Sequence, residues 1–162
     1  MRNDIRLRIR LLYDNSCGYC GVRVSDAGAL LTLDHFRPSS KGGDDELDNI
    51  VYCCHACNEF KGDYWHEEVA MRLLHPLFDD VATHYVQSED ARIFALTGRG
   101  TNHVERLRLN RPELIAYRLQ RQNEAALEEK NQQILQLLDS LRHDNEALRE
   151  QITERNISQK KR

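Results

Sequence analysis

The sequence predicts an α+β fold: a compact N-terminal module, a small β-hairpin and helix packed on it, and a long C-terminal helix. Three observations support this prediction. Five cysteines lie in two clusters within the first 57 residues and nowhere else. Up to about residue 111, short apolar runs bounded by turn residues alternate with helix-like segments. After Pro112 no glycine or proline interrupts the chain.

The chain of 162 residues has room for one modest globular domain and an appendage, but not for two independent cores. We divide it into a cysteine-containing module at 1–62, an α/β extension at 63–111 that packs on this module, a long helix at 112–155 and a basic tail at 156–162. The tail is polar and is expected to be disordered.

Four segments of the first module have recognisable patterns. Residues 3–15 predict a helix, because apolar residues recur on one face with arginines between them. The short runs 22–24 and 30–34 are joined by turn residues and predict a β-hairpin. Residues 54–65 predict a second helix that starts near the second cysteine pair.

The extension mixes both types of secondary structure. Residues 67–75 and 101–109 have helical patterns, whereas 83–87 and 92–97 are typical of strands. We therefore expect a β-hairpin with a helix on either side of it in the chain.

The C-terminal helix is expected to begin with Asn110 as its cap and Pro112 in its first turn. Within about residues 124–154, apolar side chains recur every seven residues at Leu127, Ile134, Leu141 and Leu148. The positions midway between them hold Glu124, Asn131, Leu138, Asn145 and Ile152. This is the heptad pattern of a coiled coil.

Asparagine at two of the intermediate positions favours a parallel two-stranded coiled coil, in which a buried Asn pairs with its twin. Asp144 and Arg149 also lie where opposite charges attract across such a dimer. We therefore expect a homodimer. Leu135 and Leu137 widen the apolar stripe, so packing on the protein's own body or on a partner protein remains an alternative.

The formal net charge is −3, which argues against a protein that binds nucleic acid through overall positive charge alone. Arginines nevertheless cluster along the chain, either as solvated helix faces or as phosphate contacts. The clusters are Arg2, Arg6, Arg8 and Arg10, and Arg99, Arg106, Arg108 and Arg111. No apolar run approaches the roughly 20 residues that span a bilayer, and the N-terminus lacks a signal-peptide pattern. We expect a cytoplasmic protein with no membrane contact.

The cysteines form two CxxC pairs, Cys17 with Cys20 and Cys54 with Cys57. In a reducing compartment such pairs favour metal binding over disulfides, and four thiolates suit a tetrahedral Zn²⁺ that stabilises a small fold. A redox CxxC would need a βαβ context that is not seen here. A structural zinc in a pure binding module remains an alternative, as does Cys53 in place of Cys54.

The segment between the two pairs is longer than the insert of a simple zinc ribbon, about 15 to 20 residues. It contains Asp34 and His35 at the end of a predicted strand, where adjacent side chains point to opposite faces. Phosphodiester hydrolysis needs a hard cation with few oxygen ligands and a base that takes a proton from water. Asp34 suits the first need and His35 the second. A lone histidine is more often structural, so the surrounding residues must decide.

Those residues follow a fixed order: Asp34-His35, Pro38, Gly42-Gly43, Asn49-Ile50-Val51, Cys54 to Asn58, and Lys61. Over residues 13–62 this order resembles the HNH family, the ββα-metal nucleases. The resemblance implies that His35 is the general base, that Asp34 and Asn58 bind a catalytic Mg²⁺ or Mn²⁺, and that Asn49 holds the loop that orients the base. Asn58 stands where the family also uses histidine, and a neutral amide oxygen favours hard cations.

The resemblance thus implies a metal-dependent endonuclease that hydrolyses phosphodiester bonds in DNA. The heptads of the long helix add the expectation that it is dimeric or docked to a partner through this helix. A non-catalytic zinc adaptor for nucleic acid or protein is the first alternative. An effector nuclease in a phage-defence or mobile-element complex is the second. Basic residues expected to contact DNA, or else to be ordinary surface cations, are Lys61, Arg37, Lys41, Arg99, Arg106 and Arg108.

Overall fold

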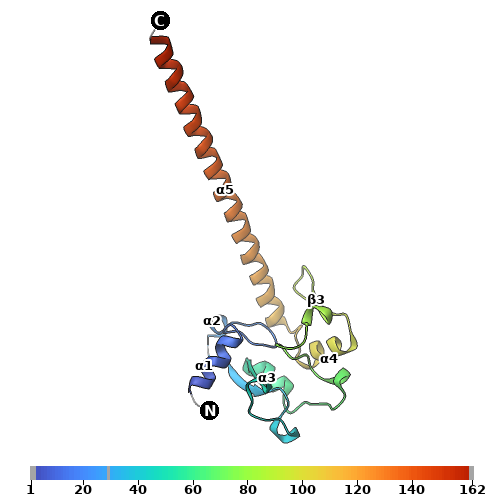
Figure 1. The fold of residues 1–162 in the computed structure, drawn as a ribbon. Coiled ribbons are helices and arrows are strands. Elements are labelled where there is room, and N and C mark those ends of the chain that lie inside the picture. The colour runs from blue at the N-terminus through green and yellow to red at the C-terminus, as the bar shows by residue number, and fades with distance from the viewer. Residues whose placement is uncertain (1–2, 29, 161–162) are drawn as a thin grey trace. The chain divides into compact units, whose positions relative to one another are not determined.

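The structure is a computed structural model that describes residues 3–28 and 30–160. It divides into two compact units, Met1–Leu119 and Gln120–Arg162. Figure 1 shows short helices and strands in the first unit and a single long helix in the second. The predicted α+β fold, with small antiparallel hairpins and a long C-terminal helix, is confirmed.

The first unit begins with helix α1 (Asn3–Leu12), whose Ile9 is buried in the core. Strand β1 (Thr32–His35) pairs antiparallel with strand β2 (Ile50–Cys53), and His35 lies opposite Ile50. Every residue of β2 is buried, so this strand forms the centre of the module. Helix α3 (His55–Lys61) follows directly, which places a short helix against a two-stranded sheet.

The predicted hairpin between 22–24 and 30–34 is wrong. The backbone of Val22 accepts a hydrogen bond from Cys17 N, and Arg23 forms a bridge with Ser16. The first run therefore closes the loop of the first cysteine pair, and the short helix α2 (Val24–Ala27) follows it. The second run instead pairs with β2, a partner that lies nearer the C-terminus.

The extension contains strands β3 (Tyr85–Gln87) and β4 (Ile93–Ala95), which form the expected antiparallel pair, and helix α4 (Gly98–Arg106). The helix predicted at 67–75 is wrong, because the structure has only the 3₁₀ turn η3 (Val69–Met71) there. The three consecutive residues Leu73 to His75 are all buried. An amphipathic helix buries only one face, so it would leave at least one of three consecutive residues exposed. The remaining 3₁₀ turns are η1 (Ser39–Lys41), η2 (Leu47–Asn49) and η4 (Val81–Thr83).

Helix α5 (Pro112–Lys160) starts at the predicted proline and ends five residues later than expected. The part of the predicted disordered tail from residue 156 to Lys160 is therefore helical. The rest of the predicted tail, residues 161–162, lies outside the described residues. Asn110 was expected to cap this helix, but its amide bonds to both the N–H and the carbonyl of Ile93. It therefore ties the start of α5 to β4. No helix among the described residues has the length and apolar character needed to cross a membrane.

Candidate metal centre and active site

The two cysteine pairs come together in the first unit. Cys17 and Cys20 lie in the loop after α1, and Cys54 and Cys57 lie at the start of α3. Their four sulfur atoms are all within 4.8 Å of one another, and Cys20 Sγ is 3.7 Å from Cys54 Sγ. Zinc–sulfur bonds of about 2.3 Å in a tetrahedron separate the sulfurs by about 3.8 Å. The four cysteines therefore fit a structural Zn²⁺, and Cys53 is not part of this cluster.

Local contacts hold these ligands in place. A Cβ on Gly18 would lie 2.6 Å from the Tyr13 ring, so the first loop requires glycine at this position. The sulfur of Cys54 accepts a hydrogen bond from Cys57 N at 3.4 Å, which caps α3. The guanidinium of Arg111 lies 3.8 Å from Cys57 Sγ, where its positive charge offsets part of the thiolate charge. The cluster is thus joined to the segment that starts α5.

Asp34 lies at the end of β1 in a nearly closed environment. Its side chain is 9 % exposed and forms an ion pair at 3.0 Å with Lys61, whose side chain is 1 % exposed. The Tyr19 hydroxyl donates a second bond to this carboxylate at 3.1 Å. Burial raises the pKa of Asp34 above its ordinary value, although Lys61 and Tyr19 act in the opposite direction. Burial thus disfavours the charged form of this carboxyl more than its two hydrogen-bond partners favour it.

Lys61 was expected either to contact a phosphate or to be an ordinary surface cation, and its burial rules out the second of these. Its ammonium donates to the carbonyl of His35 at 2.7 Å as well as to Asp34. It thus joins α3 to the end of β1. The sequence did contain a signal for this, because Lys61 follows Cys57 by four residues and so shares its inward helix face.

His35 points to a more open side of the strand. Its side chain is 31 % exposed, and its Nε2 lies 2.6 Å from Oδ1 of Asp45 in the acidic loop. A carboxylate only accepts hydrogen bonds, so Nε2 carries the proton and Nδ1 is the basic nitrogen. The sequence prediction did not include Asp45, because this pairing depends on how the loop folds back.

Asn49 joins the two ends of that loop. Its Oδ1 accepts from Arg37 N at 2.8 Å, and its Nδ2 donates to the carbonyls of Arg37 at 3.1 Å and Asp44 at 2.8 Å. Its own carbonyl accepts from Phe36 N. A Cβ on Gly43 would lie 1.8 Å from the carbonyl oxygen of Arg37, so only glycine fits this close approach. The loop that carries Asp45 is thereby fastened directly behind His35.

Asn58 is half-buried on α3, three residues before Lys61. Residues at this spacing are neighbours on one helix face. Asn58 is thus a neighbour on α3 of Lys61, the residue that bonds Asp34 at the end of β1. A carboxylate and an amide oxygen are ligands suited to Mg²⁺ or Mn²⁺, so the donors fit a hard cation in kind.

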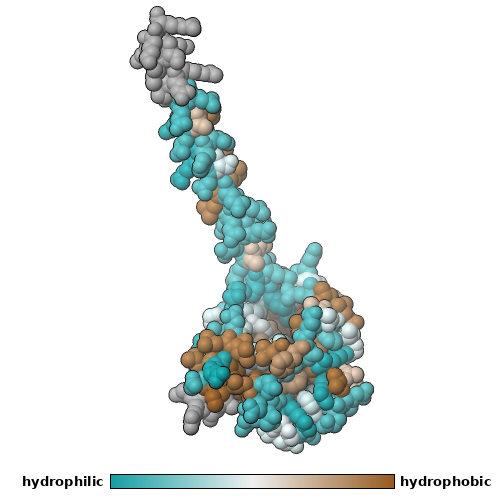
Figure 2. Space-filling model, in the orientation of Figure 1, coloured by the Kyte–Doolittle hydropathy of each residue, from teal (hydrophilic) through white to brown (hydrophobic). Residues whose placement is uncertain are grey.

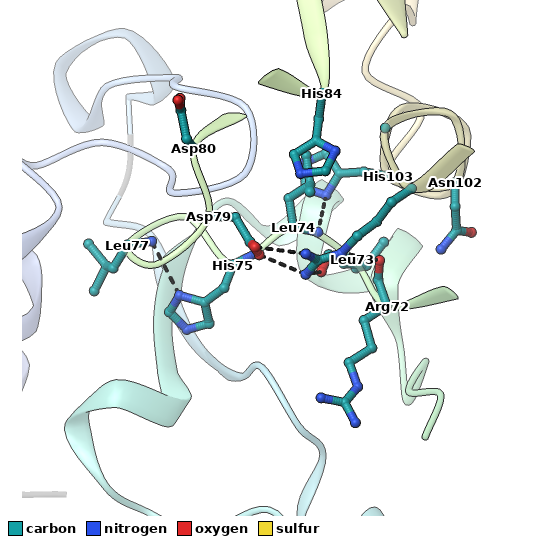
Figure 3. A network of polar contacts seen from close by, with 12 residues as sticks. Arg72, Leu73, Leu74, His75, Leu77, Asp79, Asp80, His84, Asn102 and His103 are labelled. Carbon is teal, nitrogen blue, oxygen red and sulfur yellow. Dashed lines mark hydrogen bonds and ion pairs between the residues drawn. The ribbon is translucent and has the colours of Figure 1, made fainter. Parts of the chain in front are cut away.

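The other basic residues predicted to contact DNA differ in their surroundings. Arg99 is not a surface cation: its guanidinium forms a two-pronged ion pair with Asp79 at 2.7 Å and donates to the Leu73 carbonyl. Figure 3 shows the bonds to Asp79 and the neighbouring bond from Leu74 N to His103 Nδ1. This network fastens the backbone of Leu73 and Leu74 to α4.

The remaining four are nearer to solvent. Lys41 is exposed, and Arg37 Nε donates to the Lys41 carbonyl. Arg106 and Arg108 lie over the rings of Tyr64 and Phe60 respectively. They line an open groove of about 670 Å³ between α3 and α4, which also contains acidic side chains.

Comparison with known proteins agrees with this geometry. Residues 17–74 match a family described as HNH endonuclease. This segment forms a domain of the HNH endonuclease family. The matched segment starts at Cys17 and includes β1, β2 and α3, and the four-cysteine cluster is consistent with the zinc-binding type of this family. No curated protein and no solved structure matches the chain.

Proposed function

We propose that this chain is a metal-dependent HNH endonuclease that hydrolyses phosphodiester bonds in DNA, with His35 as the general base. The observation that carries the proposal is the His35–Asp45 pair at 2.6 Å, set at the strand end of an HNH domain beside the buried carboxylate of Asp34. The family match supports nuclease chemistry, and the geometry supports the choice of base.

The residues of the chain divide this work. Asp45 accepts a hydrogen bond from Nε2–H of His35, which leaves Nδ1 free to take a proton from the attacking water. The carboxylate also stabilises the imidazolium that results. Asn49 keeps the loop that carries Asp45 in place through its bonds to Arg37 and Asp44.

Asp34 and Asn58 would hold Mg²⁺ or Mn²⁺, which stabilises the negative charge that develops on the phosphate and the leaving oxygen. Lys61 and Tyr19 orient the Asp34 carboxylate by hydrogen bonds, so this side chain would lose little conformational entropy when the cation binds. The four cysteines would hold a structural Zn²⁺ that stabilises the fold and takes no part in the chemistry.

Arg37 and Lys41 lie on the loop beside the base, and Arg106 and Arg108 lie in the groove along α3. In this proposal they contact the phosphates of the substrate, which positions the duplex without reading its sequence. A non-catalytic zinc adaptor is the second candidate, because Lys61 and Tyr19 already bond the Asp34 carboxylate.

The test is cleavage of supercoiled plasmid by the purified chain with Mg²⁺, Mn²⁺ or EDTA, alongside a single-stranded RNA substrate and a measurement of bound zinc. We expect metal-dependent cleavage of the plasmid that falls at least about 100-fold in His35→Ala, with unchanged zinc content. The matched control is His143→Ala, an exposed histidine on α5, which should cleave as the unaltered chain does.

Unchanged cleavage by His35→Ala would reject this residue as the base. If the unaltered chain cuts neither substrate with any metal but retains zinc and binds DNA, the adaptor is the correct function.

A further inference from the structure

The second unit exposes a regular stripe of large apolar side chains. Within its described residues, the six apolar side chains at the heptad positions are each 54–61 % exposed: Leu127, Ile134, Leu138, Leu141, Leu148 and Ile152. Figure 2 shows brown apolar groups among the hydrophilic residues of this helix. A single helix cannot bury such a stripe on itself, so its stability in water calls for a partner surface.

We propose that residues 124–154 pair with the same segment of a second copy of this chain as a parallel, in-register, two-stranded coiled coil. The pairing itself is independent of the proposed nuclease function. In this register Leu138 and the leucines and isoleucines of the stripe pack against their own counterparts.

Asn131 and Asn145 select this arrangement. In a parallel pair each lies opposite its twin, and the two amides form a hydrogen bond across the seam. In an antiparallel pair each would lie opposite a leucine or isoleucine and lose that bond, leaving a buried polar group without its partner. The two asparagines therefore favour the parallel, in-register pairing over its alternatives.

The side chains that flank the seam fit the same register. A parallel dimer brings each flanking residue next to the residue five positions later in the partner. Asp144 then meets the partner's Arg149, which places opposite charges together. Lys130 meets the partner's Leu135, which is 61 % exposed in one chain.

The remaining flanking pair is Leu137, also exposed in one chain, with the partner's Arg142. The aliphatic stems of lysine and arginine cover apolar surface while their charged ends stay in water. The parallel register thus covers both of the leucines that widen the stripe, Leu135 and Leu137. That coverage removes the main argument for docking α5 on a different protein.

Pairing would tether two HNH domains. This consequence rests on the proposed function: one site hydrolyses one strand, and a tethered second site meets the same DNA at a raised effective concentration. The dimer should therefore convert supercoiled plasmid to linear product, whereas separated chains should accumulate nicked circles.

The first experiment measures the mass of the full chain in solution by size-exclusion chromatography with light scattering over a range of concentrations. We expect twice the mass of one chain, 18.9 kDa. Leu141→Asp places a charge in the seam and should raise the dissociation constant at least about 100-fold. Gln136→Asp, on the opposite face of the helix, is the matched control and should leave the dimer intact.

The second experiment tests the register. Asp144→Arg and Arg149→Asp should each weaken the dimer, about 2- to 5-fold per broken contact, and the double variant should restore it. A full chain that stays at 18.9 kDa at every concentration would overturn the proposal. A dimer that the double variant does not restore would overturn the parallel register.

Failure of the two proposals is distinguishable. A chain that dimerises but does not cut DNA rejects the nuclease function and leaves the coiled coil standing. A monomer that cuts DNA in a His35-dependent way rejects the coiled coil and supports the nuclease function.

Discussion

The two units place the same kinds of residue in opposite environments. In the first unit Leu107 and Leu114 are at most 2 % exposed, whereas in the second Leu127 and Leu141 are more than half exposed. Leu114 and Leu127 even belong to the same helix, α5. Both lie in one uninterrupted helical segment, so whether each side chain is buried depends on what faces its turn of the helix.

The units also differ in what stabilises them. The first has short elements, a small core, a buried ion pair and a cluster of four thiolates. The second is one uninterrupted helix whose apolar stripe calls for another chain. Metal binding at the four cysteines is therefore expected to supply folding free energy in one unit, and association is expected to supply it in the other. Three perturbations of the first unit sharpen this contrast.

Loss of zinc should have the largest effect. Cys17→Ser removes one of four ligands, and structural zinc binding contributes about 10–16 kcal/mol in small domains. We expect the first unit to lose its fixed tertiary structure, seen by near-UV circular dichroism, while far-UV helicity and the dimer mass from α5 persist. Cys53→Ala, outside the sulfur cluster, should keep one zinc per chain. A Cys17→Ser chain with native near-UV signal would contradict the role of zinc.

Breaking the buried ion pair should have the next largest effect. Lys61→Met leaves the Asp34 carboxylate buried without its ammonium, which costs about 3–5 kcal/mol. Urea denaturation of the first unit should detect this loss, and adding Asp34→Asn should recover part of it. The dimer mass should not change. A single variant as stable as the unaltered chain would show that Lys61 does not hold this part of the fold.

Acid should reveal a smaller effect through His103. Burial lowers the pKa of this histidine to about 4, and its Nδ1 accepts a bond from Leu74 N. The unfolded chain binds the proton near pH 6.5, so stability should fall as pH drops from about 6.5 to 4, by about 3 kcal/mol. His103→Asn keeps an acceptor for Leu74 but has no such titration. Urea denaturation of both chains across this range, with zinc content followed, should show the steeper loss only with histidine.

Much of the site could be predicted from local spacing. The two CxxC pairs indicated the zinc cluster because a metal needs ligands at short, repeated intervals, and the structure brings those four sulfurs together. The Asp34-His35 pair and the residues after it indicated an HNH domain, which the family match confirms. The catalytic roles of His35, Asp34, Asn49 and Asn58 remain predictions.

The errors arose where a residue's partner lies far along the chain. The run 30–34 pairs with β2 instead of its neighbour, and the run 67–75 forms only a 3₁₀ turn, with Arg99 and His103 bonded to the backbone near its end. Local sequence patterns carry no information about such distant partners. Propensity therefore predicted the wrong strand pairing at 30–34 and a helix at 67–75.

The sequence by itself determined the two cysteine pairs that form the cluster, the HNH motif and the long helix with its heptads, because each depends on residues at fixed short intervals. Only the tertiary structure decided that Lys61 and Arg99 serve the interior, that Asp45 orients His35, and that β1 pairs with β2. An ion pair or a strand pair needs two surfaces from distant parts of the chain, and their meeting depends on how the whole unit packs.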